Sequence, residues 1–372
     1  MTTEFQPIQF VDADAQGIST ELIQAYEKAT GITLYPGDPR RIFFLQLVPV
    51  LLALKNDINY TGNQNLLPFA DGDVLDALGD RIGVPRLAAQ PATVTIRFTL
   101  SSIQLDPVAV PIGTRVTPDG SIYFATTQEL VIAAGATTGD VTAESTEGGE
   151  KYNGFVAGQI NILVDPVPYV ASVTNTDISS GGSDAETDDA YRERQRLAPS
   201  SFSVAGPTNA YIFWAMSADV TIVDVAVTSP SAGVVNVYPL LKDGGIPNQT
   251  ILDKVLAEVN ASDRRPLTDQ VSVLAPTAVN YDITLTYYIS AERSTEEAAI
   301  RAAIENAGGA IDQYEAWQKA KLGRAVTPDD LLSKMYAVGA YRVVATSPVY
   351  TAINANEVAI RNLKTVTYGG LI

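Results

Sequence analysis

The feature that most limits the fold of this chain is a change of hydrophobic period near residue 90. Before it, apolar residues recur at helical spacing, and residues 42–54 are apolar on nearly every side of a helix. After it, residues 93–100 alternate strictly between polar and apolar side chains, which is typical of a half-buried strand. Because the two periods occupy separate stretches, we expect an α+β, multidomain protein.

The chain has 372 residues, which is enough for several domains with separate cores. Residues 1–90 read as a helical region, and residues 91–178 as a β-rich barrel or sandwich with short strands and Gly/Pro turns. Beyond them, strand and helix patterns alternate. We therefore expect two small α/β domains, at 179–276 and 277–372, in which a similar order of elements roughly recurs.

Three helices are predicted in the helical region. Asp38 followed by a proline supplies an N-cap and a first-turn proline for a long helix over about 39–56, with Pro49 expected to kink it. Shorter helices are expected over 21–29 and 73–81.

The long helix has so little polar surface that something must cover it on several sides. Burial within its own small domain and packing against another protein's helices both remain open at this point. The candidate partner-contact residues are Phe43, Phe44, Leu47, Val48, Leu51 and Leu52. The apolar run over 42–54 is too short to span a bilayer, and Gln46 and Pro49 interrupt it, so we expect no membrane partner.

The stretch 180–196 predicts a helix that starts after a flexible joint. Two glycines free the backbone, acidic residues follow where the positive end of a helix favours them, and arginines lie towards its negative end. The residues concerned are Gly181, Gly182, Asp184, Glu186, Asp188, Arg192 and Arg194. We expect Asp184 or Thr187 to cap the helix, and we expect a hinge at 179–183.

The acidic residues of this stretch also invite two functional interpretations. A calcium loop would need a regular Asp/Asn spacing, a central Gly and a closing Glu, all of which are missing. A catalytic carboxylate pair would need two acids facing one cleft. A capped helix with solvated or paired charges accounts for the pattern, so we assign this stretch no catalytic residue and no metal.

Two absences and the net charge exclude several classes of function. The chain has no Cys and no His, which excludes disulfides, thiolate nucleophiles, His-based metal sites and Ser-His-Asp catalysis. Its net charge of −17 opposes sequence-independent binding of nucleic acid. The N-terminus has no basic start followed by an apolar run, so we expect synthesis in the cytoplasm without export, and we expect no cofactor.

Short sequence blocks in a fixed order carry a family resemblance. They are Tyr-Pro-Gly-Asp-Pro at 35–39, Asn-Leu-Leu-Pro at 65–68, Leu-Asp-Ala-Leu-Gly at 75–79, Ile-Gly-Thr at 112–114, Gly-Gln-Ile at 158–160, the stretch 181–194, Ala-Gly-Pro at 205–207 and Arg-Pro-Leu-Thr-Asp at 265–269. Over nearly its whole length the chain resembles the baseplate J-like family, the wedge proteins of contractile phage tails and related injection machines.

The resemblance implies a structural component of the virion tail baseplate, assembled in the bacterial host cytoplasm, rather than an enzyme. It implies pairing with a second copy, joining to a second baseplate wedge protein through the N-terminal helices, and linkage of neighbouring wedges into a six-fold ring, with sheath initiator and hub proteins as further partners. The ring would transmit the change that triggers sheath contraction. No catalytic residue carries over, and the stretch 181–194 carries over as a fold signature.

An enzymatic alternative is a carboxylate-dependent glycan hydrolase associated with a virion tail. Its support is the excess of acidic residues (42 Asp and Glu against 25 Lys and Arg) and the 17 tyrosines. Acidic residues in excess usually mark a solvated surface, and tyrosines scattered along strands usually pack in cores, so we favour the structural interpretation.

Overall fold

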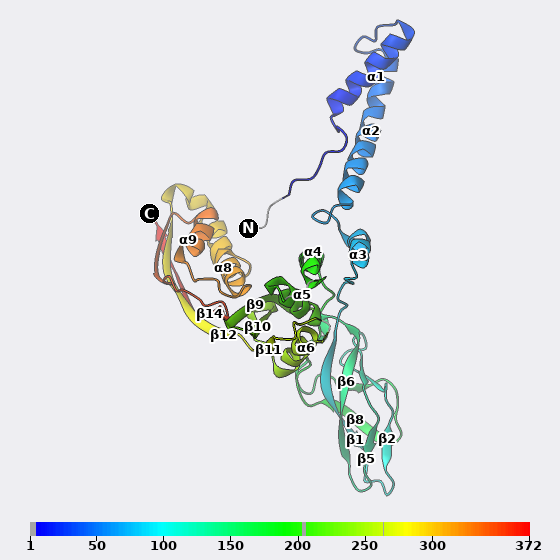
Figure 1. Ribbon diagram of the computed structural model, residues 1–372, viewed down its shortest axis with the longest axis vertical. Coiled ribbons are helices and arrows are strands. Elements are labelled where there is room, and N and C mark those ends of the chain that lie inside the picture. Colours follow the sequence, from blue (N-terminus) through cyan, green and yellow to red (C-terminus); the bar gives the residue numbers. More distant parts are fainter. Residues whose placement is uncertain (1–4, 203–205, 263) are drawn as a thin grey trace. The chain divides into compact units, whose positions relative to one another are not determined.

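A computed structural model describes residues 5–202, 206–262 and 264–372 (Figure 1). The chain divides into two compact units. One comprises Met1–Arg86 with Tyr191–Gln195, and the other comprises Leu87–Ala190 with Arg196–Ile372. The first is helical, whereas the second contains a six-stranded sheet and two three-stranded sheets with helices. The predicted α+β, multidomain class is therefore confirmed.

The helical unit is built around a hairpin of α1 (Ala15–Thr30) and α2 (Pro39–Gln64), followed by α3 (Gly72–Asp80). The predicted cap of α2 is confirmed, since the Asp38 side chain accepts a hydrogen bond from the Arg40 N–H at 2.9 Å. Helix α1 starts earlier than predicted because Asp14 caps it, accepting from the Gln16 and Gly17 N–H groups. Helix α2 also runs further than predicted and continues without interruption through Pro49.

The β-rich region is a nearly closed antiparallel barrel. Its strand order is β7-β3-β4-β6-β1-β8. The strands are β1 (Pro91–Leu100), β3 (Arg115–Thr117), β4 (Phe124–Thr126), β6 (Thr138–Gly148), β7 (Ile162–Leu163) and β8 (Val170–Asn175), with β2 (Val108–Val110) and β5 (Leu130–Ile132) as a separate pair. The two ends of the sheet meet where the Asn175 N–H donates to the Ile160 carbonyl at 3.1 Å.

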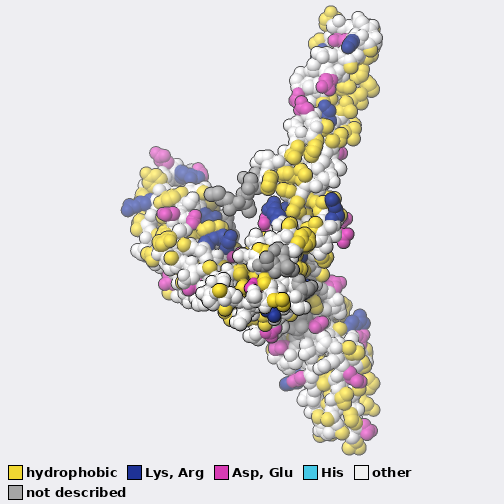
Figure 2. Space-filling model, viewed as in Figure 1, with side chains coloured by type: hydrophobic (Ala, Val, Ile, Leu, Met, Phe, Trp, Pro, Cys, Tyr) yellow, Lys and Arg dark blue, Asp and Glu magenta, His cyan; other side chains and the backbone are white. Residues whose placement is uncertain are grey.

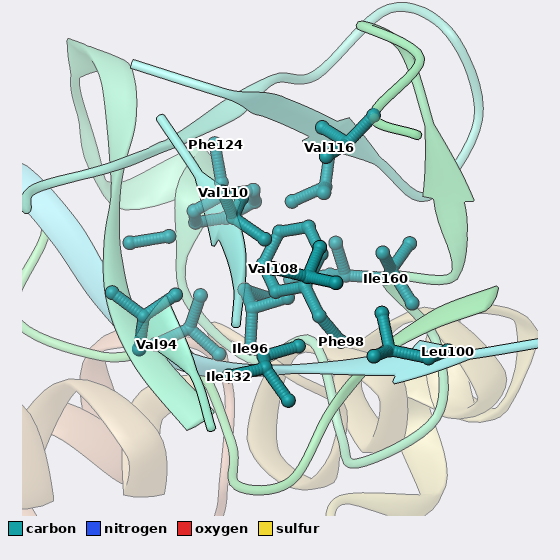
Figure 3. Packing of buried hydrophobic residues seen from close by; sticks show 14 of the residues in the cluster. Val94, Ile96, Phe98, Leu100, Val108, Val110, Val116, Phe124, Ile132 and Ile160 are labelled. Atoms are coloured by element: carbon teal, nitrogen blue, oxygen red, sulfur yellow. The ribbon is translucent and has the colours of Figure 1, made fainter. Parts of the chain in front are cut away.

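The strict alternation over 93–100 produces the barrel core. Val94, Ile96, Phe98 and Leu100 of β1 point inward and are buried with Phe124 of β4 (Figure 3). Strand β1 lies between β6 and β8, and its register places Ile96 opposite Val141. The predicted turn after β3 is confirmed as well, with Gly120 at φ +83° between two paired antiparallel strands.

The central domain is a small α/β layer in which two strands, a helix and a third strand follow a first helix. Its elements are α5 (Thr208–Ala218), β9 (Ile222–Ser231), β10 (Val234–Leu241), α6 (Gln249–Val259) and β11 (Gln270–Val273). Strand β10 pairs antiparallel with β9 and parallel with β11. Side chains of both helices and of the sheet form one core that includes Tyr211, Val237 and Val255.

The C-terminal domain does not repeat that order, so this part of the prediction is wrong. Its elements are β12 (Thr277–Ile289), α7 (Glu297–Glu305), α8 (Ala310–Lys319), α9 (Pro328–Ala337), β13 (Arg342–Ser347) and β14 (Glu357–Leu371). Strand β12 is central, parallel to β14 and antiparallel to β13.

Short 3₁₀ helices also occur in the described residues of the barrel, central and C-terminal parts of the chain. They are Glu150–Tyr152, Ala198–Phe202, Lys242–Gly244 and Ala291–Glu296.

The central and C-terminal domains share a small core and a polar contact. The shared core contains Tyr238 and Leu240 of β10 together with Leu322 and Val358. Beside it, Asp224 Oδ2 of β9 accepts a hydrogen bond from the Leu322 N–H at 2.8 Å. Burial raises the pKa of the Asp224 carboxyl, although the Leu322 N–H and the charges of Lys321 and Arg324 oppose that rise.

This raised pKa makes a prediction for Asp224→Asn. The amide keeps an acceptor for the Leu322 N–H but carries no charge, so the variant should unfold at higher urea than wild type at neutral pH. Because the folded-state pKa of Asp224 lies above its unfolded value, wild type regains stability as pH falls, so the difference should shrink on approach to about pH 4 and be lost below it. Urea titrations of both proteins at neutral pH and near pH 4 check this, and a constant difference would contradict it.

Candidate partner-binding surface and signature motif

Helix α1 covers only one side of α2. Val48 of α2 is buried together with Ile18 and Ile23 of α1. The rings of Tyr26 and Phe44 lie 5.2 Å apart, centroid to centroid. Elsewhere α2 is open, and only 6% of its most apolar stretch is buried. The sequence left two interpretations of α2 open. The structure does not show the first of them, burial of α2 within its own domain.

The open side of α2 carries a continuous row of apolar side chains. Phe43, Val50, Leu54 and Ile58 are 60%, 58%, 53% and 51% exposed, and half-buried Leu47 lies between the first two. At 100° per residue, these five positions share one face of the helix. We call these five residues the α2 stripe. Figure 2 shows hydrophobic side chains gathered along the α1–α2 hairpin.

A groove between the two helices adjoins the α2 stripe. It has a volume of about 470 Å³, and its lining includes Ile18 and Leu22 of α1 with Leu51, Leu54 and Ile58 of α2. Contiguous exposed apolar surface of this kind usually marks a binding site for another protein. The apolar run 42–54 alone is too short to cross a membrane, as expected from the sequence, whereas the whole of α2 could do so by length and composition alone.

In the structure, the six partner-contact candidates differ in their exposure to solvent. Phe43 is exposed, and Phe44, Leu47, Leu51 and Leu52 are half-buried. Val48 is buried in the hairpin core, which corrects its place in the set. Val50, Leu54 and Ile58, which were not among the six candidates, are exposed. The sequence signal for the exposed side of α2 was the apolar face of α1 around Ile18 and Ile23, because the packing of α1 determines which side of α2 is covered.

The signature helix starts later than the acidic stretch suggested. Helix α4 is Asp188–Leu197, with Asp188 and Asp189 in its first turn as predicted. The Thr187 hydroxyl accepts from the Ala190 N–H at 3.4 Å, so Thr187 rather than Asp184 stands in the capping position. Asp184 Oδ1 instead accepts from the Glu150 N–H at 3.0 Å.

Glu186 lies before the helix rather than in its first turn, which corrects its predicted role. The side chain is buried, and its Oε2 accepts a hydrogen bond from the Leu87 N–H at 3.0 Å. In return the Glu186 N–H donates to the Leu87 carbonyl at 3.0 Å. Glu186 therefore fastens two chain segments that are far apart in sequence.

This arrangement makes a prediction for Glu186. Substitution by Ala removes the buried acceptor for the Leu87 N–H and should cost about 1–3 kcal/mol of unfolding free energy. Substitution by Gln keeps an acceptor oxygen and should cost less. Urea denaturation of the two variants measures the difference, and equal losses would contradict the assigned hydrogen bond.

The proposed hinge segment is fastened to the barrel. Ser180 and Thr93 exchange main-chain hydrogen bonds at 2.8 and 3.1 Å, and Ser183 and Gln90 do so at 2.8 and 3.0 Å. A Cβ on Gly182 would lie 2.5 Å from the Gly149 carbonyl oxygen, so only glycine fits there. Bending within 179–183 would have to break these bonds, and the hinge stays a prediction that a second conformational state must test.

The two signature arginines contact main-chain carbonyls of the helical unit. Arg192 Nη2 donates to the Ala70 carbonyl at 2.9 Å, and Arg194 Nη2 to the Pro85 carbonyl at 2.6 Å. Arg194 is only 3% exposed. Both residues were predicted to lie as charges towards the negative end of the helix. Their contacts instead make this part of α4 a fixed member of the helical unit.

The acidic residues and tyrosines do not point to a metal site or a catalytic site. Within residues 5–202, 206–262 and 264–372, no cluster of three or more Asp, Glu, His or Cys side chains could hold a metal ion. The largest fully buried side chains include Tyr191, Tyr287 and Tyr314. These tyrosines serve as core residues, in line with the structural interpretation of the tyrosine content.

Comparisons with known families match two parts of the chain. Residues 95–182 match the model of the baseplate J-like protein barrel domain, which agrees with the barrel described above. Residues 203–275 match the model of the baseplate J-like central domain, which covers α5 to β11.

Curated relatives give the same result. Baseplate protein J of Escherichia phage P2 is 31% identical over 189 residues, covering 50% of this chain and 60% of the relative. A putative baseplate protein, gp29, of Haemophilus phage HP1 is 30% identical over 189 residues, covering 47% and 46%. The uncharacterized protein YqbT of Bacillus subtilis is 26% identical over 207 residues, covering 55% and 51%. These matches thus span about half the length of each relative.

A solved structure of the anti-feeding prophage baseplate, six-fold symmetrised, contains a similar chain. The identity is 14%, the coverage is 92% of this chain and 90% of that one, and the TM-score is 0.48. The barrel and central domain models match in sequence order and a phage J protein is 31% identical, so residues 95–182 and 203–275 are similar to the barrel and central domains of the baseplate J-like family.

Proposed function

We propose that this protein is a structural component of a tail baseplate. In this proposal it acts as a wedge protein that links neighbouring wedges into a ring around the hub and transmits the change that triggers sheath contraction. The similarity to domains of the baseplate J-like family supports the location. The observation that carries the proposal is the α2 stripe, an apolar helix face that its own unit leaves exposed.

The spacing of the α2 stripe favours another helix as its partner. Positions 43, 47, 50, 54 and 58 follow steps of four, three, four and four residues, on average 3.75, so they form a row along one side of the helix that side chains of a second helix can pack against. In this proposal a helix from a second copy inserts side chains between them, and a second wedge protein is a further partner of the helical unit. Burying this face removes apolar surface from water at about 25 cal/mol per Å².

The helical unit is suited to hold such a partner firmly. Helix α2 is braced by α1 through Val48 and the Tyr26–Phe44 ring contact, so its stripe is presented by a rigid hairpin rather than a loop. Rigid presentation lowers the entropy lost on binding. A lipid membrane could also cover an apolar helix face. The fractionation experiment described next distinguishes membrane binding from binding to another protein.

Fractionation of tail particles tests the proposal. Tails purified from the bacterial source should contain the chain in several copies per baseplate, and disassembled baseplates should retain it with other wedge proteins. Recovery of the chain only in the membrane fraction would overturn the proposal. Release of sugar from cell-wall or capsular glycan by the purified chain would instead favour the hydrolase alternative.

A further inference from the structure

A groove in the C-terminal domain follows strand β13, which forms one edge of its sheet. The strand order is β13-β12-β14, so β13 pairs with β12 on one side only. The groove beside β13 has a volume of about 600 Å³. Besides β13, it is lined by Pro328 and Leu332 of α9 and by Pro348, Val349 and Tyr350. We call it the β13 groove.

The β13 groove lies along the edge of the strand rather than on one face of the sheet. Successive side chains of a strand point to opposite faces. Every residue from Arg342 to Thr346 lines the groove, so the groove reaches both faces and the main-chain edge between them. Within the described residues, no second strand pairs with that edge. Its outward main-chain N–H and C=O groups are therefore open to a further strand.

Strand β13 lacks features that usually protect an edge strand. Lysine, proline and bulges commonly prevent further pairing at such an edge. Residues 342–347 contain neither Lys nor Pro, and their register with β12 is regular from Arg342 to Ala345 and shifts only beyond it. The opposite edge strand, β14, carries Lys364 and two successive glycines. Of the two edges of this sheet, β13 is thus the one suited to pairing.

The rim of the β13 groove is apolar and aromatic. Val349 and Tyr350 are 64% and 67% exposed, and Val344 of β13 is 43% exposed. Tyr336, which follows Leu332 by about one turn of α9, is 46% exposed. Tyrosine is enriched in protein interfaces, and exposed apolar side chains gathered around a concave surface indicate a binding site for another protein.

An arginine at the start of β13 restricts the chemistry of the occupant. Arg342 is exposed and lies over the Tyr288 ring at 5.8 Å, and in the described part of the chain it forms no ion pair. By contrast, Arg293, Arg301 and Arg361 of the same domain each pair with a glutamate. A carboxylate on the occupant would complement Arg342. Strand β13 itself contains no Asp or Glu, so pairing of two β13 strands would not supply one.

We propose that the β13 groove binds an extended segment of another protein as an added strand. The main chain of the segment pairs with the open edge of β13. Its apolar side chains contact Val344, Val349 and Tyr350, and an acidic side chain near one end pairs with Arg342. In strand addition, main-chain hydrogen bonds give affinity and alternate side chains give specificity. This site is separate from the α2 stripe and does not rest on the proposed function.

Peptide selection tests the β13 groove. A library of random dodecapeptides is selected on the immobilised full-length chain, and the enriched peptides are synthesised and titrated. We expect apolar residues at alternate positions and an acidic residue near one end. Tyr350→Ala should weaken binding about tenfold or more, whereas Tyr35→Ala, at a tyrosine 71% exposed in the other unit, should leave it unchanged. If no enriched peptide distinguishes these two variants, the proposal is wrong.

Two further measurements determine how the peptide binds. N-methylation of its amides, one at a time, should abolish binding at alternate positions only, because every second N–H of an added strand points to β13. Arg342→Glu should weaken binding about tenfold, and exchanging the acidic residue of the peptide for Lys should restore it. Equal losses at every amide would exclude strand pairing. Self-association of the chain that Tyr350→Ala removes would assign the groove to a second copy. Either result would overturn the proposal.

Discussion

Replacing Val50 and Leu54 by Asp is expected to abolish association of the chain with its second copy without unfolding it. The two side chains are 58% and 53% exposed, so the folded chain tolerates the charges. In a helix-to-helix interface, each buried Asp would cost about 2 kcal/mol or more. Two such losses weaken binding about 1,000-fold, enough to turn a stable pair into a monomer at micromolar concentration.

Sedimentation of wild type and variant at matched concentration measures this effect. The control is Leu105→Asp/Leu267→Asp, which adds the same charge at two leucines that are 93% and 96% exposed in the other unit. The control should sediment as wild type does. Association that survives in the stripe variant, with circular dichroism unchanged, would mean that another surface joins the copies.

Gly79→Ala is expected to disrupt the packing of α3 against Tyr191 of α4. A Cβ at Gly79 would lie 1.8 Å from the Tyr191 hydroxyl oxygen and 2.6 Å from the Val84 carbonyl oxygen. Tyr191 is fully buried, and its hydroxyl donates to that same carbonyl at 2.6 Å. The helical unit should lose about 3–5 kcal/mol, because overpacking and loss of a buried hydrogen bond act together.

A compensating substitution tests this explanation. Tyr191→Phe removes the hydroxyl that the new Cβ meets first, so the double variant should be more stable than Gly79→Ala alone. Rescue should be partial, since the Val84 carbonyl oxygen still lies 2.6 Å from the added carbon. Thermal denaturation of the four proteins gives the coupling energy. Strict additivity would contradict the assigned contact.

Local signals in the sequence predicted the elements well. Asp38 before Pro39 marked the start of α2, and the same pairing of a cap residue with a first-turn proline, Thr327 before Pro328, stands at the start of α9. The alternation over 93–100 predicted β1 and its buried face. These features work because caps, first-turn prolines and period-two patterns act within a few residues, without help from tertiary structure.

Features that depend on distant partners could not be read from the sequence. Helix α8 was missed because Gln318, a polar residue, is fully buried and donates to the Arg324 carbonyl. The role of Arg194 was misjudged because its acceptor, the Pro85 carbonyl, lies 109 positions away. The exposed side of α2 could not be chosen either, since α2 is apolar all round and only the placement of α1 distinguishes its faces.

The exposed apolar surface of the helical unit also depends on partners, in this case on neighbouring proteins. A helix that is apolar all round is expected in a protein that binds neighbouring proteins, and the α2 stripe is not covered by the rest of its unit. The barrel, central and C-terminal domains each have their own core, with a small shared core between the last two. The stripe is therefore the part of the molecule whose burial depends most on assembly.

The most direct test of this account is a cryo-EM map of the intact tail end. It should show residues 43–58 of α2 packed along their exposed face against a helix of another chain, with Phe43, Val50, Leu54 and Ile58 out of contact with water. A baseplate in which this face of α2 points into solvent, while the copies are joined elsewhere, would contradict the account.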